Sequence, residues 1–398
     1  MRSERLRRHL RDDVMCYWMQ PELIGDGSGN FPTYATQNGR TLPDTINFTR
    51  MQGRRTYAYL VAYQLLGDRE YADLAQAGLR YLSRLENSKG GYYAASTSSG
   101  TPCRLPISVQ DLSYAGLPLV QAYATFHDQC YLDQAWKLID FILQPPYFRD
   151  GRFVADALSP DYMHEVYFEG EDVNLVTVLD FLGCLYIPAL ANSPRELQTE
   201  ERWRTLKILC DFLVDNFRGE GGIFWNSRTN RHSLWAKHVD MGHTAKAYGV
   251  LWDAEAVLCD LTAETRYASL FDAFVGKLLS ASDDKVGWRT DFSPDGKRME
   301  ARSLEWWRHI VLDQVSAKYA IRFPEVKQAL MNGIRTWFDL EYIDRDRPCR
   351  GVRQRLAPDG SCKEQSDLSV CKANDWKSAF HEVDHVRTLL HYFEGVND

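Results

Sequence analysis

The chain has 398 residues, of which 44% are hydrophobic and 25% are charged, and its formal net charge is −7. This composition is typical of a globular protein and excludes wholesale disorder. The acidic balance argues against nucleic acid or an anionic membrane surface as the main partner, because both require a positive field.

Neither end of the chain nor its cysteines indicate export or a membrane. Residues 1–18 are basic and lack the apolar core of a signal peptide. The longest apolar stretch, 175–190, contains Asp180 and is too short to cross a bilayer. The nine cysteines are scattered and form no C-x-x-C pair, so neither a disulfide framework nor a zinc ribbon is predicted. We expect a cytoplasmic protein.

Helical periodicity recurs along the whole chain, with few strand signals. Gly67-Asp68 and His127-Asp128 form short joints, so the helices that flank each joint should be antiparallel neighbours. In chain order the expected helices are 3–18, 44–65, 70–86, 108–126, 131–144, 171–192, 199–217, 241–261, 264–280, 303–321, 324–341 and 376–393.

These twelve helices make six hairpins that open about every 60 to 75 residues, which indicates a structural repeat. Glycines followed by aromatic residues at 90–93, 221–225 and 287–288 suit tight turns into short strands. We predict an all-α (α/α)6 barrel over 1–398, a single domain in which six hairpins form a toroid with short β-hairpins in the loops. Closure requires the first helix to pair with the last, and an open helical solenoid is the alternative.

The last predicted helix contains His381-Glu382-x-x-His385, a pattern that binds zinc in metalloproteases with the glutamate as general base. Thr388 stands where such a protease needs a glycine turn, and only seven residues follow His391. The helix should therefore continue and carry His391 to another face. We predict no metal site and keep a zinc peptidase as a minor alternative.

A second histidine, His243, stands near the start of another predicted inner helix, after Asp240 and Gly242. A helix N-terminus favours a neutral imidazole, which can accept a proton. Gly242 permits close approach of backbone and ligand. From these residues alone, a buried histidine bonded to the core remains the alternative.

Arg50, Gln52, Arg54 and Arg55 cluster among apolar residues of the second predicted helix, which indicates that one guanidinium faces inward. A buried guanidinium needs an anionic or strongly polar partner. A structural ion pair accounts for the cluster equally well.

Other polar and aromatic residues stand where predicted inner helices begin. Asp111 and Asn174 are residue types that cap helices. Trp306-Trp307 and Trp376 offer flat faces that stack on sugar rings, although core packing explains most of the eleven tryptophans.

From about residue 45 to 390 the chain resembles the N-acylglucosamine 2-epimerase family, a family of sugar epimerases and isomerases. The matching segments are Met51-Gln52-Gly53-Arg54 with Tyr57, Gly242-His243, Trp306-Trp307, and Trp376-Lys377-Ser378-Ala379-Phe380-His381. The last of these fits the family pattern W-K-x-x-Y/F-H. The family fold is an (α/α)6 barrel, which the periodicity predicts independently.

The resemblance implies that His243 and His381 are an acid/base pair and that Arg54 binds and polarises the sugar. Epimerisation or isomerisation removes the C2 proton beside a carbonyl, passes through an enediolate and returns the proton. One histidine abstracts, the other donates, and a cation stabilises the oxyanion, so no metal or cofactor is required. The candidate substrate-binding residues around this pair are Asn174, Lys246, Trp307, Trp376, Tyr57, Asp111 and Asp240.

The chain departs from the family at three places. Val173-Asn174 stands where many members have Met-His, Lys246 replaces a glutamate, and Val311 lies where a second glutamate is common, although Asp313 is close. The loss of two carboxylates and the gain of a cation predict a pocket that prefers an anionic or differently substituted sugar, or one that has lost the parent reaction.

We therefore predict a cofactor-independent sugar 2-epimerase or aldose–ketose isomerase that acts on a small carbohydrate, as a monomer or homodimer, without nucleic acid or membrane. Two alternatives stay open. In a glycosidase or lyase, paired carboxylates such as Asp111 and Asp240 should converge on the pocket. In a non-catalytic sugar-binding protein, the polar residues would only line a cleft.

Overall fold

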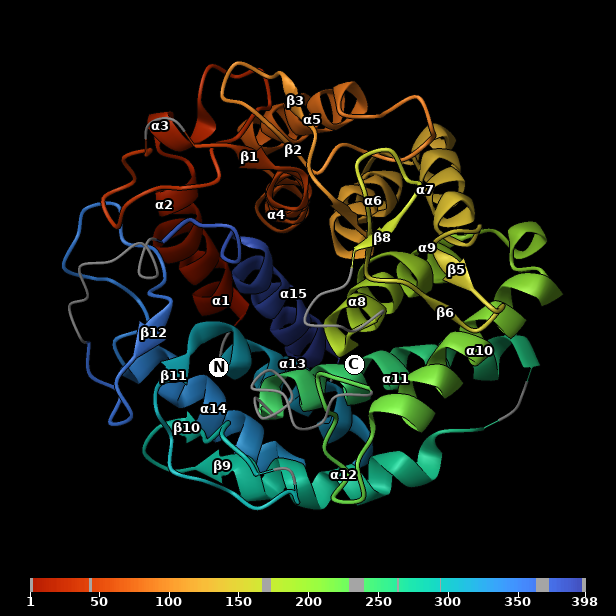
Figure 1. Cartoon of the computed structure of the whole chain (residues 1–398). Helices are drawn as coiled ribbons and strands as arrows, with labels where there is room; N and C mark the ends of the chain where they lie inside the picture. The colour runs from red at the N-terminus through yellow and green to blue at the C-terminus, as the bar shows by residue number, and fades with distance from the viewer. Residues whose placement is uncertain are drawn as a thin grey trace.

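The helices of the chain form two concentric rings (Figure 1). The structure is a computed structural model, and it describes residues 3–42, 45–166, 173–228, 240–262, 265–293, 295–362 and 372–395. Within these residues the inner ring consists of α4 (Thr49–Leu66), α6 (Val109–Phe126), α8 (Leu175–Asp180) with its continuation through η2 (Phe181–Tyr186) and α9 (Ile187–Asn192), α11 (Met241–Thr262), α13 (Trp306–Arg322) and α15 (Phe380–Gly395).

The outer ring is made by the partner helix of each hairpin. Its members are α1 (Ser3–His9) with its continuation through η1 (Leu10–Met15) and α2 (Cys16–Trp18), then α5 (Arg69–Arg84), α7 (Gln129–Ile142), α10 (Glu200–Phe217), α12 (Ala268–Ala281) and α14 (Val326–Asp339). Two short helices, α3 (Pro21–Ile24) and η3 (Arg195–Leu197), lie in connections.

The ring is closed. Each inner helix packs against the next, and α15 contacts both α13 and α4. The amino-terminal α1 and η1 pack against α15, so the first helix pairs with the last, as closure requires. The predicted (α/α)6 barrel is confirmed, and the open solenoid is wrong.

Short joints set the antiparallel hairpins at two of the predicted places. Gly67 ends α4 in the left-handed conformation, at φ 80°, which glycine adopts without strain. His127 ends α6 in the same region, at φ 58°. Asp128 then caps α7 by accepting a hydrogen bond from the Cys130 N–H. Each reversal therefore takes two residues.

Strands of two residues lie in the loops and precede several inner helices. They pair antiparallel as β1 (Asn47–Phe48), β2 (Ala95–Ser96) and β3 (Pro102–Cys103); β4 (Ile107–Ser108), β7 (Ala157–Leu158) and β8 (Glu165–Val166); β5 (Phe148–Arg149) with β6 (Phe153–Val154); β9 (Ser282–Asp283) with β10 (Gly287–Trp288); and β11 (Leu304–Glu305) with β12 (Arg355–Leu356). Because β1, β4 and β11 run directly into α4, α6 and α13, they fix where these helices begin.

Five predicted helix starts are too early by three residues or more, and one of them is that of α12, which was predicted from 264 and begins at Ala268. Strand pairing occupies 47–48 and 304–305, so α4 begins at Thr49 and α13 at Trp306. Residues 171–172 lie outside the described part of the chain, and α8 begins at Leu175. The Asn374 side chain accepts hydrogen bonds from the N–H groups of Trp376 and Lys377, at 2.8 and 2.9 Å, which holds a turn there. Consequently α15 begins only at Phe380.

The segment Leu175–Asn192 is long and apolar enough to cross a membrane, but 72% of it is buried inside the protein. It is the inner helix α8–η2–α9, surrounded by α6, α10 and α11. Its apolar composition is explained by this position, because an inner helix is enclosed by protein on every side.

Candidate active site

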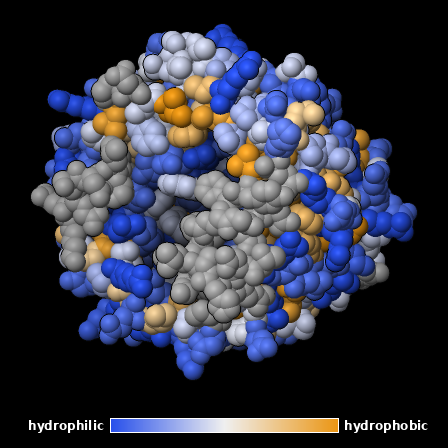
Figure 2. Space-filling view, viewed as in Figure 1, coloured by the Kyte–Doolittle hydropathy of each residue, from blue (hydrophilic) through white to orange (hydrophobic). Residues whose placement is uncertain are grey.

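All six inner helices contribute to one set of polar and aromatic side chains near their N-terminal ends. These side chains are Arg54 on α4, Tyr114 on α6, Asp180 on α8, His243 and Lys246 on α11, Trp307 on α13, and His381 on α15. Figure 2 shows a hollow with a mostly hydrophilic wall near the middle of the viewed face. The ring thus brings together residues from the first and the last inner helices of the chain.

The two candidate catalytic histidines lie on either side of Trp307. The ring centroid of His243 is 4.6 Å from that of Trp307, and the centroid of His381 is 6.4 Å from it. The two imidazoles are therefore at most about 11 Å apart, the sum of those distances. A single small molecule in contact with Trp307 can reach both rings.

His243 is held by the residue just before its helix. Asp240 accepts hydrogen bonds from the His243 backbone N–H and from its Nδ1, both at 2.8 Å. Burial raises the pKa of Asp240, but His243 and Arg308 outweigh burial and lower it far below its usual range. Asp240 is therefore a carboxylate at neutral pH. Gly242 makes room for this arrangement, since a Cβ there would lie 2.8 Å from both Trp307 and Arg308.

His381 has a different environment. Its ring makes no hydrogen bond to any residue that the structure describes, and it packs against Phe380 at 4.9 Å and Trp306 at 6.1 Å. Burial, followed by the charges of Arg54 and Lys246, holds the pKa of His381 well below its usual value. At neutral pH this imidazole is uncharged and can accept a proton.

Arg54 is the buried guanidinium that the sequence indicates. Its side chain lies 3.8 Å above the Tyr114 ring, and its Nη1 donates to the Trp376 carbonyl at 2.9 Å. Its Nε is buried without a hydrogen-bond partner among the described residues. Arg54 also forms no ion pair with the described residues. The structural ion pair that the sequence left as an alternative is made by the neighbouring Arg50, which pairs with Asp111 at 3.1 Å.

Lys246 is not a free cation. Its ammonium binds the carboxylate of Asp180, which is completely buried. Asp180 also accepts hydrogen bonds from Tyr114 at 2.9 Å and Gln110 at 2.6 Å. Asp180 thus supplies a negative charge from α8 that matches the positive charge of Lys246.

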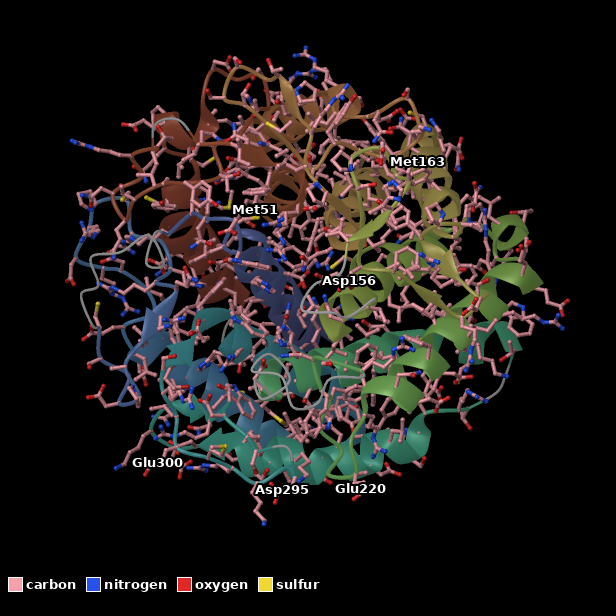
Figure 3. The ribbon with its side chains drawn as sticks, viewed as in Figure 1. Met51, Asp156, Met163, Glu220, Asp295 and Glu300 are labelled. Atoms are coloured by element: carbon pink, nitrogen blue, oxygen red, sulfur yellow. The ribbon has the colours of Figure 1, made fainter. Side chains whose placement is uncertain are left out.

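Three other candidate substrate-binding residues have protein partners. Asp111 forms a capping box with Ser108 at the start of α6, in addition to its ion pair with Arg50. Asn174 caps α8 and donates to Asp156 at 2.6 Å. Asp156 lies toward the middle of the ring in Figure 3, far from the rim residues Glu220 and Asp295.

The third is Tyr57, which is buried and donates to Asp384 at 2.7 Å. Each of these three polar groups is bonded to another residue of the protein, so it shapes the site indirectly and not by binding a ligand. Trp376, in contrast, is 53% exposed, and the Arg50 guanidinium lies 5.2 Å from its ring.

The H-E-x-x-H pattern does not assemble a metal site. Glu382 is buried in an ion pair with Lys377, and His385 binds Asp313 at 2.9 Å in the core. No group of three or more potential metal ligands occurs among the described residues. The zinc peptidase has no support here.

Two charged residues of the site were missed from sequence. Asp180 pairs with Lys246, and Arg308 lies 3.8 Å from Asp240 and 3.6 Å from Asp291. A lone aspartate within a long apolar stretch was a usable signal for Asp180, because a buried carboxylate needs a partner. No pattern in the neighbouring sequence distinguished Arg308 from an arginine on the protein surface.

Comparison with known proteins points to sugar epimerases. The family model described as N-acylglucosamine 2-epimerase (GlcNAc 2-epimerase) matches residues 29–175. A cellobiose 2-epimerase of Bacteroides fragilis is 21% identical over 402 residues, which cover 95% of this chain and 96% of that protein.

Solved structures extend the similarity of the fold. The cellobiose 2-epimerase from Spirochaeta thermophila DSM 6192 has a TM-score of 0.83 at 17% identity, covering 100% of this chain and 97% of that one. A D-mannose isomerase has a TM-score of 0.77 at 16% identity, covering 97% of each chain. An inactive variant of the α-1,6-mannanase GH76A of Salegentibacter sp. HEL1_6 is less similar, with a TM-score of 0.61 at 13% identity and 98% coverage of each chain.

Proposed function

Because the chain belongs to the N-acylglucosamine 2-epimerase family, we propose that it is a sugar 2-epimerase or aldose–ketose isomerase that moves the C2 proton of a reducing sugar between His381 and His243. The observation that carries this proposal is the placement of both imidazoles against Trp307, at most about 11 Å apart. The protein would act in the cytoplasm, as a monomer or homodimer, and the chemistry calls for no cofactor.

The two histidines differ in the way that such a reaction needs. His381 is uncharged, since burial and nearby cations lower its pKa, so it is the base that removes the C2 proton. His243 is bound to a carboxylate through Nδ1, which directs its Nε2 away from Asp240, so His243 takes the role of the partner that returns a proton to the sugar.

A cation next to the reacting carbons completes the mechanism. Removal of the C2 proton places negative charge on the carbonyl oxygen of the open-chain sugar. The Arg54 guanidinium has a buried Nε without a partner among the described residues, and none of their carboxylates forms an ion pair with it. It is therefore the group that stabilises the enediolate, at low cost because it is already fixed on Tyr114.

The carboxylates do not favour a glycosidase. That reaction needs one acid and one carboxylate that both face the scissile bond. Asp111 is committed to Ser108 and Arg50, and Asp240 to His243.

The test is proton exchange at C2. Cellobiose and D-mannose, the sugars in the names of similar proteins, serve as first substrates in D2O, with other aldoses to follow. We expect deuterium at C2, detected by NMR, and its loss by at least about 100-fold in His381→Gln and in His243→Gln.

His391→Gln is the matched control, because His391 is exposed on the same helix as His381. It should exchange at the wild-type rate. Exchange that persists in either site variant, with the fold intact by circular dichroism, would remove that histidine from the mechanism.

A further inference from the structure

The contacts of Asp240 distinguish it from a residue that binds the sugar. Its two carboxylate oxygens are both used by His243: Oδ1 accepts the backbone N–H, and Oδ2 lies 2.8 Å from Nδ1. The residue is 5% exposed, which leaves little surface for a substrate. Asp240 therefore acts on any ligand through His243.

We propose that Asp240 is a positioning residue that keeps a proton on Nδ1 of His243 and so presents Nε2 as the nitrogen that exchanges a proton with the substrate. This inference rests on the proposed function. It deepens that function by naming the residue that decides which nitrogen of His243 exchanges a proton with the sugar.

Residues next to α11 and on α11, α13 and α15 surround the His243 ring. Asp240 stands just before its helix, and Lys246, whose charge Asp180 compensates, stands one turn after His243. From α13, Trp307 packs on the ring at 4.6 Å. Arg308, also on α13, lies 3.8 Å from Asp240 and 3.6 Å from Asp291, and across Trp307 stands His381 on α15.

The chemistry follows from the fixed proton. When Nδ1–H points at a carboxylate, Nε2 is the nitrogen that faces away from it and can exchange a proton with a ligand. In a turnover in which the neutral His381 imidazole takes the C2 proton, His243 must enter with protons on both Nδ1 and Nε2, and its Nε2 proton then moves to the substrate. The two histidines then hold the opposite charges, and exchange with water restores the resting state.

A simpler role for Asp240 is that of a helix cap. An asparagine at this position would preserve the cap, because its side-chain oxygen can still accept the His243 backbone N–H. However, its amide would present an N–H to Nδ1 and so force the proton onto Nε2. Asp240→Asn therefore separates the two roles.

The experiment uses the full chain labelled with 15N-histidine, with the His243 signals assigned by their loss in His243→Gln. We expect long-range 15N–1H spectra to show a protonated Nδ1 in the wild type and a shift of that proton to Nε2 in Asp240→Asn. We also expect kcat for C2 exchange to fall by at least about 100-fold with KM changed by less than about threefold, since binding contacts are kept.

Asp295→Asn is the matched control, because Asp295 is exposed and pairs with Lys297, away from His243. It should keep the Nδ1 proton and lose less than about threefold in kcat. The proposal is overturned if Asp240→Asn leaves the tautomer unchanged, or if it leaves kcat within threefold of the wild type.

The two proposals fail in different ways. If the wild type catalyses no exchange at C2 with any aldose, the proposed function is wrong. The position of the His243 proton in the resting protein is measured without substrate, so it still decides the role of Asp240.

Discussion

At the scale of single residues, the charge state of His381 is set by what the ring places around it. The side chain has no hydrogen-bond partner among the described residues, and Arg54 and Lys246 approach it from α4 and α11. Burial and like charge both disfavour the imidazolium. A histidine on an isolated helix would lack both effects.

This environment predicts the pH dependence of the reaction. Because the pKa of His381 is lowered, the neutral base persists as pH falls, and activity is lost only when His381 becomes protonated. We expect the acid limb of kcat/KM for C2 exchange to lie below pH 6.5, the usual value for histidine. A limb at or above that pH would contradict this account of the site.

Lys246→Gln tests the cause of the shift. The variant removes a positive charge near His381 and leaves Asp180 less compensated, so protonation of His381 becomes easier and the acid limb moves to higher pH. Lys297→Gln is the control, because Lys297 is exposed and pairs with Asp295 at the rim. Its pH profile should match that of the wild type.

At the scale of elements, the inner helices present their site residues in register. Arg54, Tyr114, Asp180 and Lys246 are each the sixth residue of α4, α6, α8 and α11. Helices that begin at the same level of the ring place equal positions at equal depth. The structural repeat of the hairpins therefore builds the site, although the side chains at equivalent positions differ.

Close packing of α4 on α6 holds these two helices, and therefore their site residues, at the same depth in the ring. A Cβ on Gly53 would lie 1.8 Å from the Tyr114 carbonyl oxygen, a distance that forces the two backbones apart. We expect Gly53→Ala to lower the free energy of unfolding by at least about 2 kcal/mol, measured by urea denaturation. It should also slow C2 exchange, because Tyr114 supports Arg54.

Gly276 offers the opposite case on an outer helix. Gly276 lies on α12, and a Cβ added to it would meet no neighbouring atom within 4 Å. Gly276→Ala should therefore raise the free energy of unfolding by about 0.5–1 kcal/mol, since alanine favours helix and restricts the unfolded chain. Equal effects of the two substitutions would show that the contact between α4 and α6 is not tight.

At the scale of the whole molecule, the amino-terminal helix seals the ring. Leu10, in η1, is fully buried, and η1 packs against both α15 and α4, the last and first inner helices. His381 is the second residue of α15 and Arg54 lies on α4, so this seam also supports the two sides of the site.

We expect Leu10→Ala to lower the free energy of unfolding by about 2–5 kcal/mol, as for other buried leucines. Leu279→Ala, on outer helix α12 with Leu279 36% exposed, should cost less than about 1 kcal/mol. Both values come from urea denaturation. Similar costs at the two positions would mean that the seam contributes no special stability.

The sequence by itself predicted the helices and favoured the closed barrel over an open solenoid, and the family resemblance singled out the two histidines as candidates. Helical periodicity is a local property, and the apolar faces it defines must be buried wherever the helix lies. The same holds for the joints at Gly67 and His127, which depend on a few consecutive residues. The actual starts of α4, α13 and α15 were not predictable in this way, because strand pairs and the Asn374 turn set them.

Only the tertiary structure decided which charges meet. Lys246 finds Asp180, Arg50 finds Asp111 while Arg54 stays unpaired among the described residues, and His385 turns from His381 into the core to bind Asp313. These partners are 61 to 72 residues apart in the chain. Electrostatic pairing depends on distance in space, and that distance is fixed only when the six hairpins close into a ring.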